Sequence, residues 1–182
     1  MKAVQLDQFG MSSNALNLPK VGQIGILVYD VEKTRAHYEK VYGIKPWIVF
    51  EKKPEFTIEK TGPVDATLKI ATAYLGTVQL ELIQVVSGRS YYNETLDVRE
   101  GLHHLGFMVN DLEKRLEICK ANGIGVLQRG QIKLKLITVD YAYLDTAAQG
   151  GIIFELIQTR IGPIKMKMNR LNHRISAWTG IQ

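Results

Sequence analysis

An internal repeat constrains this chain more than any other feature of its sequence. The stretch QIGILVYDVEK begins at Gln23, and the closely similar stretch HLGFMVNDLEK begins at His104. A second pair of similar segments follows these two, LELIQ from Leu80 and FELIQ from Phe154. Two copies of one pattern in one chain predict two equivalent structural units related by a pseudo-two-fold axis.

Each copy predicts the same order of secondary structure. An apolar run (residues 21–28, then 102–109) is too short for a buried helix and predicts a strand. Asp30 and Asp111 follow as helix N-caps, and a glycine is expected to end each amphipathic helix. Three strand-like runs come after each helix: 46–51, 66–75 and 77–86 in the first copy, and 125–130, 135–146 and 150–159 in the second. The predicted fold class is therefore α+β, with two tandem βαβββ modules.

These boundaries divide the chain into five parts, of which the two modules form one domain over residues 21–160. The parts are an N-terminal extension (1–20), the first module (21–86), a polar connector (87–100), the second module (101–160) and a C-terminal amphipathic tail (161–182).

The tail is predicted to be a helix. Pro163 suits a first helical turn, and apolar residues then recur at steps of three and four, which makes one apolar stripe along a helix: Ile164, Met168, Leu171, Ile175 and Trp178. Such a stripe packs either on its own domain or against a second subunit, because it would otherwise be an exposed apolar patch. We expect a homodimer.

Composition narrows the class of protein. Apolar residues make up 46% of the 182 positions, and no apolar run approaches the roughly 20 residues of a membrane span, so no membrane partner is expected. The net charge of +5 is scattered along the chain, which argues against a nucleic-acid partner and suits a small anionic ligand. The single cysteine, Cys119, lies in a helical run; it predicts a core residue and a reducing cytoplasm.

Four polar residues fall at matching places in the two apolar copies: Gln23, Glu81, His104 and Glu155. A buried polar side chain needs a partner, and two buried carboxylates repel each other unless a cation lies between them. An amide, two carboxylates and an imidazole suit Zn²⁺, Ni²⁺, Co²⁺ or Mn²⁺. The alternative hypothesis is that no metal is bound: Glu81 and Glu155 are then exposed on edge strands, and Gln23 forms a hydrogen bond with the backbone. Strand alternation puts His103 on the opposite face from His104, which predicts a packed or solvent-touching residue.

The duplicated pattern resembles the vicinal oxygen chelate superfamily, which includes glyoxalases, bleomycin-resistance proteins and dioxygenases. The resemblance covers about residues 21–160. It implies a cleft for a divalent metal between the modules, with one ligand on the first and last strand of each module. Laid onto this chain, these ligand positions are Gln23, Glu81, His104 and Glu155.

Two enzymatic reactions are compatible with this resemblance. EGLHHLGFMVNDLEKRL and QGGIIFELIQ are similar to the GLHH and GG-x-x-x-EL patterns of methylmalonyl-CoA epimerases, which predicts 2-acyl-CoA epimerisation. The set of Gln, Glu, His and Glu is similar to zinc-using glyoxalase I, a lactoylglutathione lyase, although its usual Asn-Trp-Gly is replaced here by VVSGRS. Epimerases typically carry His and Gln where this chain has Gln23 and Glu81. A hypothesis of another class is a small-molecule or antibiotic-binding protein of the bleomycin-resistance type.

Both enzymatic readings imply one chemistry. A divalent metal that polarises a carbonyl oxygen helps the adjacent carbon to lose its proton, and two carboxylates can remove a proton from one face and return one to the other. Glu155 is the predicted base and Glu81 its complement. The predicted substrate is a small anionic acyl-CoA or thiol adduct. The remaining candidates are Arg89 and Arg99 as contacts for an anionic substrate group, and Tyr141 and Tyr143 as packing residues.

Overall fold

The two copies of the repeat meet through their first strands. A computed structural model of the chain describes residues 15–166 and residue 173, and in it β1 (Gln23–Leu27) pairs antiparallel with β7 (Gly101–Met108). The last long strand of each copy lies outside this pair: β6 (Val78–Gly88) runs parallel to β1, and β10 (Ile153–Ile161) runs parallel to β7. The centre of the sheet is therefore a pseudo-symmetric set of four strands, in the order β6-β1-β7-β10.

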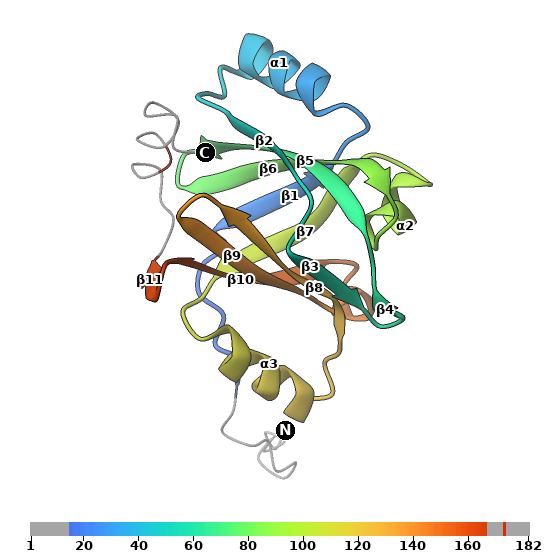
Figure 1. The fold of residues 1–182 in the computed structure, drawn as a ribbon, viewed down its shortest axis with the longest axis vertical. Coiled ribbons are helices and arrows are strands. Elements are labelled where there is room, and N and C mark those ends of the chain that lie inside the picture. The colour runs from blue at the N-terminus through green and yellow to red at the C-terminus, as the bar shows by residue number, and fades with distance from the viewer. Residues whose placement is uncertain (1–14, 167–172, 174–182) are drawn as a thin grey trace, which may run out of the picture.

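Both copies contain the predicted βαβββ order. In the first copy the further elements are α1 (Val31–Tyr42), β2 (Ile48–Lys52) and β5 (Ala66–Leu75). In the second they are α3 (Leu112–Ala121), β8 (Val126–Leu134), β9 (Ile137–Leu144) and the short 3-10 helix η1 (Ala147–Gln149). The strands form one curled sheet, and α1 and α3 lie outside it at opposite ends (Figure 1). The α+β prediction with two modules is confirmed.

Two short strands were not predicted, and they connect the two copies. β3 (Phe56–Glu59) and β4 (Gly62–Pro63) lie between β2 and β5 in the sequence. β3 pairs with β8 of the second copy, although β2 lies at the far end of the sheet beside β5. The chain therefore crosses from one edge of the curled sheet to the other, and the segment between β2 and β3 links the two edges. The connector also contains an unpredicted helix, α2 (Tyr92–Leu96).

The helix caps differ between the copies. Asp30 Oδ1 accepts a hydrogen bond from the Lys33 amide at 2.9 Å, as predicted for an N-cap. Asp111 makes no such bond. Asp111 is nevertheless the N-cap residue of α3, as predicted. Its carboxylate accepts from Arg115 Nε at 2.7 Å, and this ion pair replaces the capping bond. Cys119 is buried in the second copy's core with Leu112 and Leu156, which confirms its packing role.

The beginning of the tail is a strand. Residues Ile164–Met166 form β11, which pairs antiparallel with β10, so the prediction of a helix starting at Pro163 is wrong for these residues. The rest of the predicted helix lies outside the described residues, except for His173. That side chain is buried against β5, where its ring packs on Tyr74. Among the described residues, no helix is long and apolar enough to cross a membrane.

A glycine on β1 lets a histidine of β7 lie across the sheet. Gly25 is paired with His104 on one side and with Glu81 on the other. A Cβ atom at position 25 would lie 1.9 Å from His104 Cε1 and 2.2 Å from His104 Nε2. The imidazole therefore occupies the space above Gly25 that any side chain would need.

We predict that Gly25→Ala destabilises the fold by about 1–3 kcal/mol, because the fully buried His104 ring must be displaced. The measurement is the free energy of unfolding in denaturant. Gly125→Ala is the control, since a Cβ there would have no neighbour closer than 3.7 Å, and it should stay within about 0.5 kcal/mol of the original. Equal stability of the two variants would contradict the placement of His104.

Candidate metal and proton-transfer site

The four predicted site residues lie in two neighbouring sets of residues that are paired across adjacent strands, and all four are on the inner face of the sheet. In one set Gly25 lies between Glu81 and His104. In the next, Gly106 is paired with Gln23 on one side and with Glu155 on the other. A Cβ at Gly106 would lie 2.8 Å from Gln23 Oε1. Since Gly25 and Gly106 occupy equivalent places in the repeat, each copy's glycine makes room for a polar side chain of the other copy.

Three of the predicted ligands contact one another. His104 Nε2 lies 3.0 Å from Glu155 Oε2 and 3.6 Å from Glu81 Oε2. The His104 side chain is fully buried, and the Glu155 and Glu81 side chains are 5% and 15% exposed. The alternative of two exposed carboxylates is therefore wrong. Gln23 lies beside this group, but its Nε2 donates to Gln79 Oε1 at 3.0 Å, in a side-chain pair that sequence reasoning missed.

The site has more negative than positive charge. Burial, together with the charge of Glu155, raises the pKa of Glu81 to about 7, and His104 opposes this rise. Burial lowers the pKa of His104, but the nearby Glu155 and Glu81 carboxylates outweigh burial, so the net direction is upward. Two buried carboxylates thus share one imidazole, an arrangement that a cation would stabilise.

The chemical types of the donor atoms suit a divalent metal, but their arrangement in the structure is not that of a formed metal site. Gln23 Oε1 is buried without a hydrogen-bond partner, and the buried His104 Nε2 and Glu155 Oε2 face each other at 3.0 Å. Such a mixed oxygen and nitrogen set suits a divalent transition metal. Within the described part of the chain, however, no group of three or more His, Cys, Asp and Glu side chains is arranged as a metal-binding cluster. The convergence of all four residues on one ion therefore stays a prediction.

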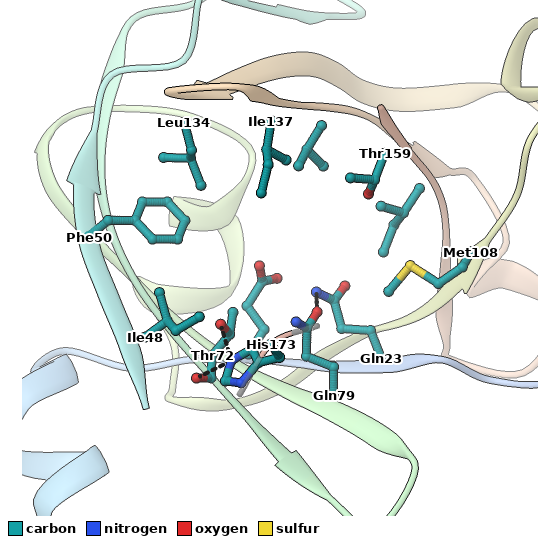
Figure 2. A pocket seen from close by; sticks show the side chains of 13 residues that line it. Gln23, Ile48, Phe50, Thr72, Gln79, Met108, Leu134, Ile137, Thr159 and His173 are labelled. Carbon is teal, nitrogen blue, oxygen red and sulfur yellow. Dashed lines mark hydrogen bonds between the residues drawn. The ribbon is translucent and has the colours of Figure 1, made fainter. Parts of the chain in front are cut away.

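Two of the donor residues, Gln23 and Glu81, open onto a cavity of about 110 Å³ inside the curled sheet. Figure 2 shows Gln23, Gln79, Thr72 and His173 along one side of it and the apolar side chains of Phe50, Leu134 and Ile137 along the other. Glu81 lines this cavity as well. A smaller cavity of about 40 Å³ is lined by Gln23, Glu81 and Glu155, with Tyr141 and Tyr143 in its wall. The site therefore combines a polar wall with an apolar one.

His173 also lines the larger cavity, and no sequence pattern indicated this role. Its Nε2 lies 3.1 Å from Thr72 Oγ1 and 3.0 Å from the Thr72 carbonyl oxygen. Thr72 is paired with Glu81 across β5 and β6. The residue comes from the tail, at a position outside the predicted apolar stripe. A contact between residues so far apart in sequence has no local pattern to reveal it.

His103 lies on the same side of the sheet as His104, so the predicted alternation is wrong here. The pairing of β1 with β7 shifts register between Gly25 and Ile26, where β7 carries one extra residue. Such a β-bulge breaks the alternation of side chains. The Nδ1 atoms of the two histidines lie 3.0 Å apart. His103 is 5% exposed, which confirms that it is packed.

The other sequence candidates have structural roles. Arg89 pairs with Asp97 at 2.5 Å, and Arg99 donates to the Glu100 carbonyl at 3.3 Å. Neither arginine lines the two cavities described above. Tyr141 and Tyr143, on β9, are buried in a core cluster that residues of both copies share, as predicted for packing residues.

Known proteins share this fold. The sequence matches the glyoxalase/bleomycin resistance protein/dioxygenase superfamily over residues 22–143. It is 26% identical over 146 residues to the uncharacterized protein YqjC of Bacillus subtilis, which covers 78% of this chain and 93% of that protein.

Solved structures with the same fold include methylmalonyl-CoA epimerases. The enzyme from Mycobacterium tuberculosis has a TM-score of 0.55 at 18% identity, covering 81% of this chain and 92% of that one. A Streptomyces coelicolor epimerase in complex with 2-nitronate-propionyl-CoA has a TM-score of 0.55 at 18% identity, covering 82% and 99%. At these identities the likeness establishes the fold alone. With a family match over most of its length and the paired modules in its structure, the chain belongs to the glyoxalase/bleomycin resistance protein/dioxygenase superfamily.

Proposed function

We propose that this protein is a divalent-metal-dependent enzyme that moves a proton at the carbon next to a carbonyl group, with epimerisation of a 2-acyl-CoA as its reaction. The observation that carries the proposal is the placement of two buried carboxylates around one imidazole nitrogen. Glu155 and Glu81 approach His104 Nε2 to 3.0 and 3.6 Å. They come from β10 and β6, which flank the central pair of strands on opposite sides.

The roles follow from this pseudo-symmetric placement. Glu155 removes the proton from one face of the reacting carbon, and Glu81 delivers a proton to the other face. Gln23 Oε1, Glu81, His104 Nε2 and Glu155 are the proposed metal ligands. A divalent metal bound there would supply Lewis-acid stabilisation of the negative charge that develops on the carbonyl oxygen. The apolar wall excludes water from the reacting carbon.

The size of the cavity suits a short acyl group. Its volume of about 110 Å³ is small beside the roughly 300–1,000 Å³ of pockets that enclose a whole drug-sized ligand. Together with the smaller cavity that Glu155 lines, it would hold the reacting end of an acyl-CoA and leave the nucleotide outside. The Streptomyces coelicolor epimerases of this fold were solved with 2-nitronate-propionyl-CoA, which supports an acyl-CoA as the substrate class.

A second candidate is a glyoxalase I-type reaction on the hemithioacetal of glutathione. The observation in its favour is the polar pair on β1 and β6: an amide at Gln23 and a carboxylate at Glu81, both lining the same cavities. Formation of thioester from methylglyoxal and glutathione tests this candidate directly. Deuterium uptake by methylmalonyl-CoA in D₂O tests the epimerase.

We predict that Glu155→Gln lowers the rate of deuterium exchange at the acidic carbon of methylmalonyl-CoA by at least about 100-fold, because the amide cannot accept the proton. Metal content stays largely unchanged, since an amide oxygen still ligates. Exchange is followed by NMR. Glu51→Gln is the control, because Glu51 is exposed on β2 and its substitution should leave exchange unaltered. Near-normal exchange in the Glu155 variant would place the base elsewhere.

We also predict that a chelator abolishes exchange and that Zn²⁺, Ni²⁺, Co²⁺ or Mn²⁺ restores it. Gln23→Ala should weaken metal binding by at least about 10-fold through loss of one oxygen ligand. Competition with a chromophoric chelator measures the dissociation constant. Gln149→Ala, at an exposed position of η1, is the control and should bind metal normally. Exchange that is insensitive to the chelator would refute the metal requirement.

A further inference from the structure

The two adjacent histidines of β7 form a buried hydrogen bond through like atoms. His103 Nδ1 and His104 Nδ1 lie 3.0 Å apart, and the residues are 5% and 0% exposed. Two imidazole nitrogens at this distance need one proton between them, since each neutral ring has one donor and one acceptor nitrogen. One of the two histidines therefore donates from Nδ1 and the other accepts at Nδ1.

The surroundings of His104 decide which ring donates when a metal is bound. Its Nε2 faces the carboxylates of Glu155 and Glu81 at 3.0 and 3.6 Å. To bind a metal, that nitrogen must present its lone pair, so the proton of the neutral ring must be on Nδ1. Within the described part of the chain, the hydrogen-bond partner of that Nδ1 is His103 Nδ1. His103 is then the acceptor and carries its own proton on Nε2.

Three tyrosine rings hold His103 in this position. Their centroids lie 5.8 Å (Tyr91), 5.4 Å (Tyr92) and 5.2 Å (Tyr143) from the His103 ring. The Tyr92 and Tyr143 hydroxyls are hydrogen-bonded to each other at 3.0 Å. The contacts with Tyr91 and Tyr143 are edge-to-face, a favourable geometry for aromatic pairs. The orientation of the His103 ring is therefore fixed by packing from several sides.

We infer that His103 is a positioning residue, which accepts a hydrogen bond from His104 Nδ1 and thereby keeps His104 Nε2 unprotonated and directed at the metal. The inference rests on the proposed metal site. Histidine ligands commonly donate their second nitrogen to a carboxylate, a carbonyl or water, and loss of such a partner typically lowers metal affinity by about 10–100-fold. Here a neighbouring imidazole takes that part, which the β-bulge makes possible by bringing both rings to one side.

Two substitutions separate hydrogen bonding from packing. His103→Phe keeps an aromatic ring among the tyrosines but has no acceptor, whereas His103→Asn places an amide oxygen near the position of Nδ1. We expect the phenylalanine variant to bind Zn²⁺ and Co²⁺ about 10–100-fold more weakly and the asparagine variant to recover most of the affinity. His37→Phe, on the exposed face of α1, is the control and should bind normally. Competition with a chromophoric chelator gives the dissociation constants, and the thermal midpoint of the metal-free proteins reports packing.

A spectroscopic measurement tests the tautomers directly. In the zinc-loaded protein, two-bond nitrogen–proton couplings should identify Nδ1–H on His104 and Nε2–H on His103. The opposite pair of tautomers would overturn the inference. The inference would also be overturned if His103→Phe bound metal with normal affinity while His104→Ala did not bind it. That result would leave the proposed metal site intact. Absence of metal binding by the unmodified protein would overturn the site and the inference together.

Discussion

The antiparallel pairing of β1 with β7 is the interaction on which the site depends. It joins two copies of one sequence pattern through equivalent strands, so that Gly25 meets His104 while Gly106 meets Gln23. In each case the polar side chain of the other copy occupies the space that a side chain at the glycine position would fill. A substitution at either glycine therefore acts on the opposite copy. Both copies have the same pattern, a polar donor followed two residues later by a glycine. Each copy needs its glycine because the donor of the other copy occupies the space beside it.

The wall facing the donors depends on a different interaction. β3 leaves the first copy and pairs with β8 of the second, which holds the two ends of the curled sheet together. Apolar side chains from β2, β8 and β9 then face the donors across the cavity, among them Phe50, Leu134 and Val139. The polar wall comes mainly from the strands at the symmetric centre, and the apolar wall comes from strands at the edges. The cavity is thus defined by both pairings together.

The parts of this arrangement that sequence reasoning predicted are those set by local patterns. A polar residue within an apolar strand is a local feature, and the matching positions of Gln23, Glu81 and Glu155 in the two copies predicted buried polar side chains. The position of His103 was missed because a β-bulge depends on the register between two distant strands. The contact of His173 with Thr72 joins residues 101 positions apart. No periodicity in either segment encodes such a contact, and the same is true of the β3–β8 pair.

The charges of the site bear on the choice between the two candidate reactions. The resemblance to epimerases would place one carboxylate among the four ligands, whereas this chain has two, Glu81 and Glu155, both largely buried. A divalent cation held by one carboxylate keeps a net positive charge and attracts a second carboxylate from the substrate. Held by two, it is neutralised by the protein, and a carboxylate next to the reacting carbon gains little attraction in an already compensated site. A hemithioacetal presents neutral oxygens there, and methylmalonyl-CoA presents a charged group. Because this chain has Gln23 and Glu81 where epimerases typically carry His and Gln, the added carboxylate would favour the neutral reacting end of the second candidate's substrate over a charged one. The paired geometry for moving a proton would serve either proposed reaction.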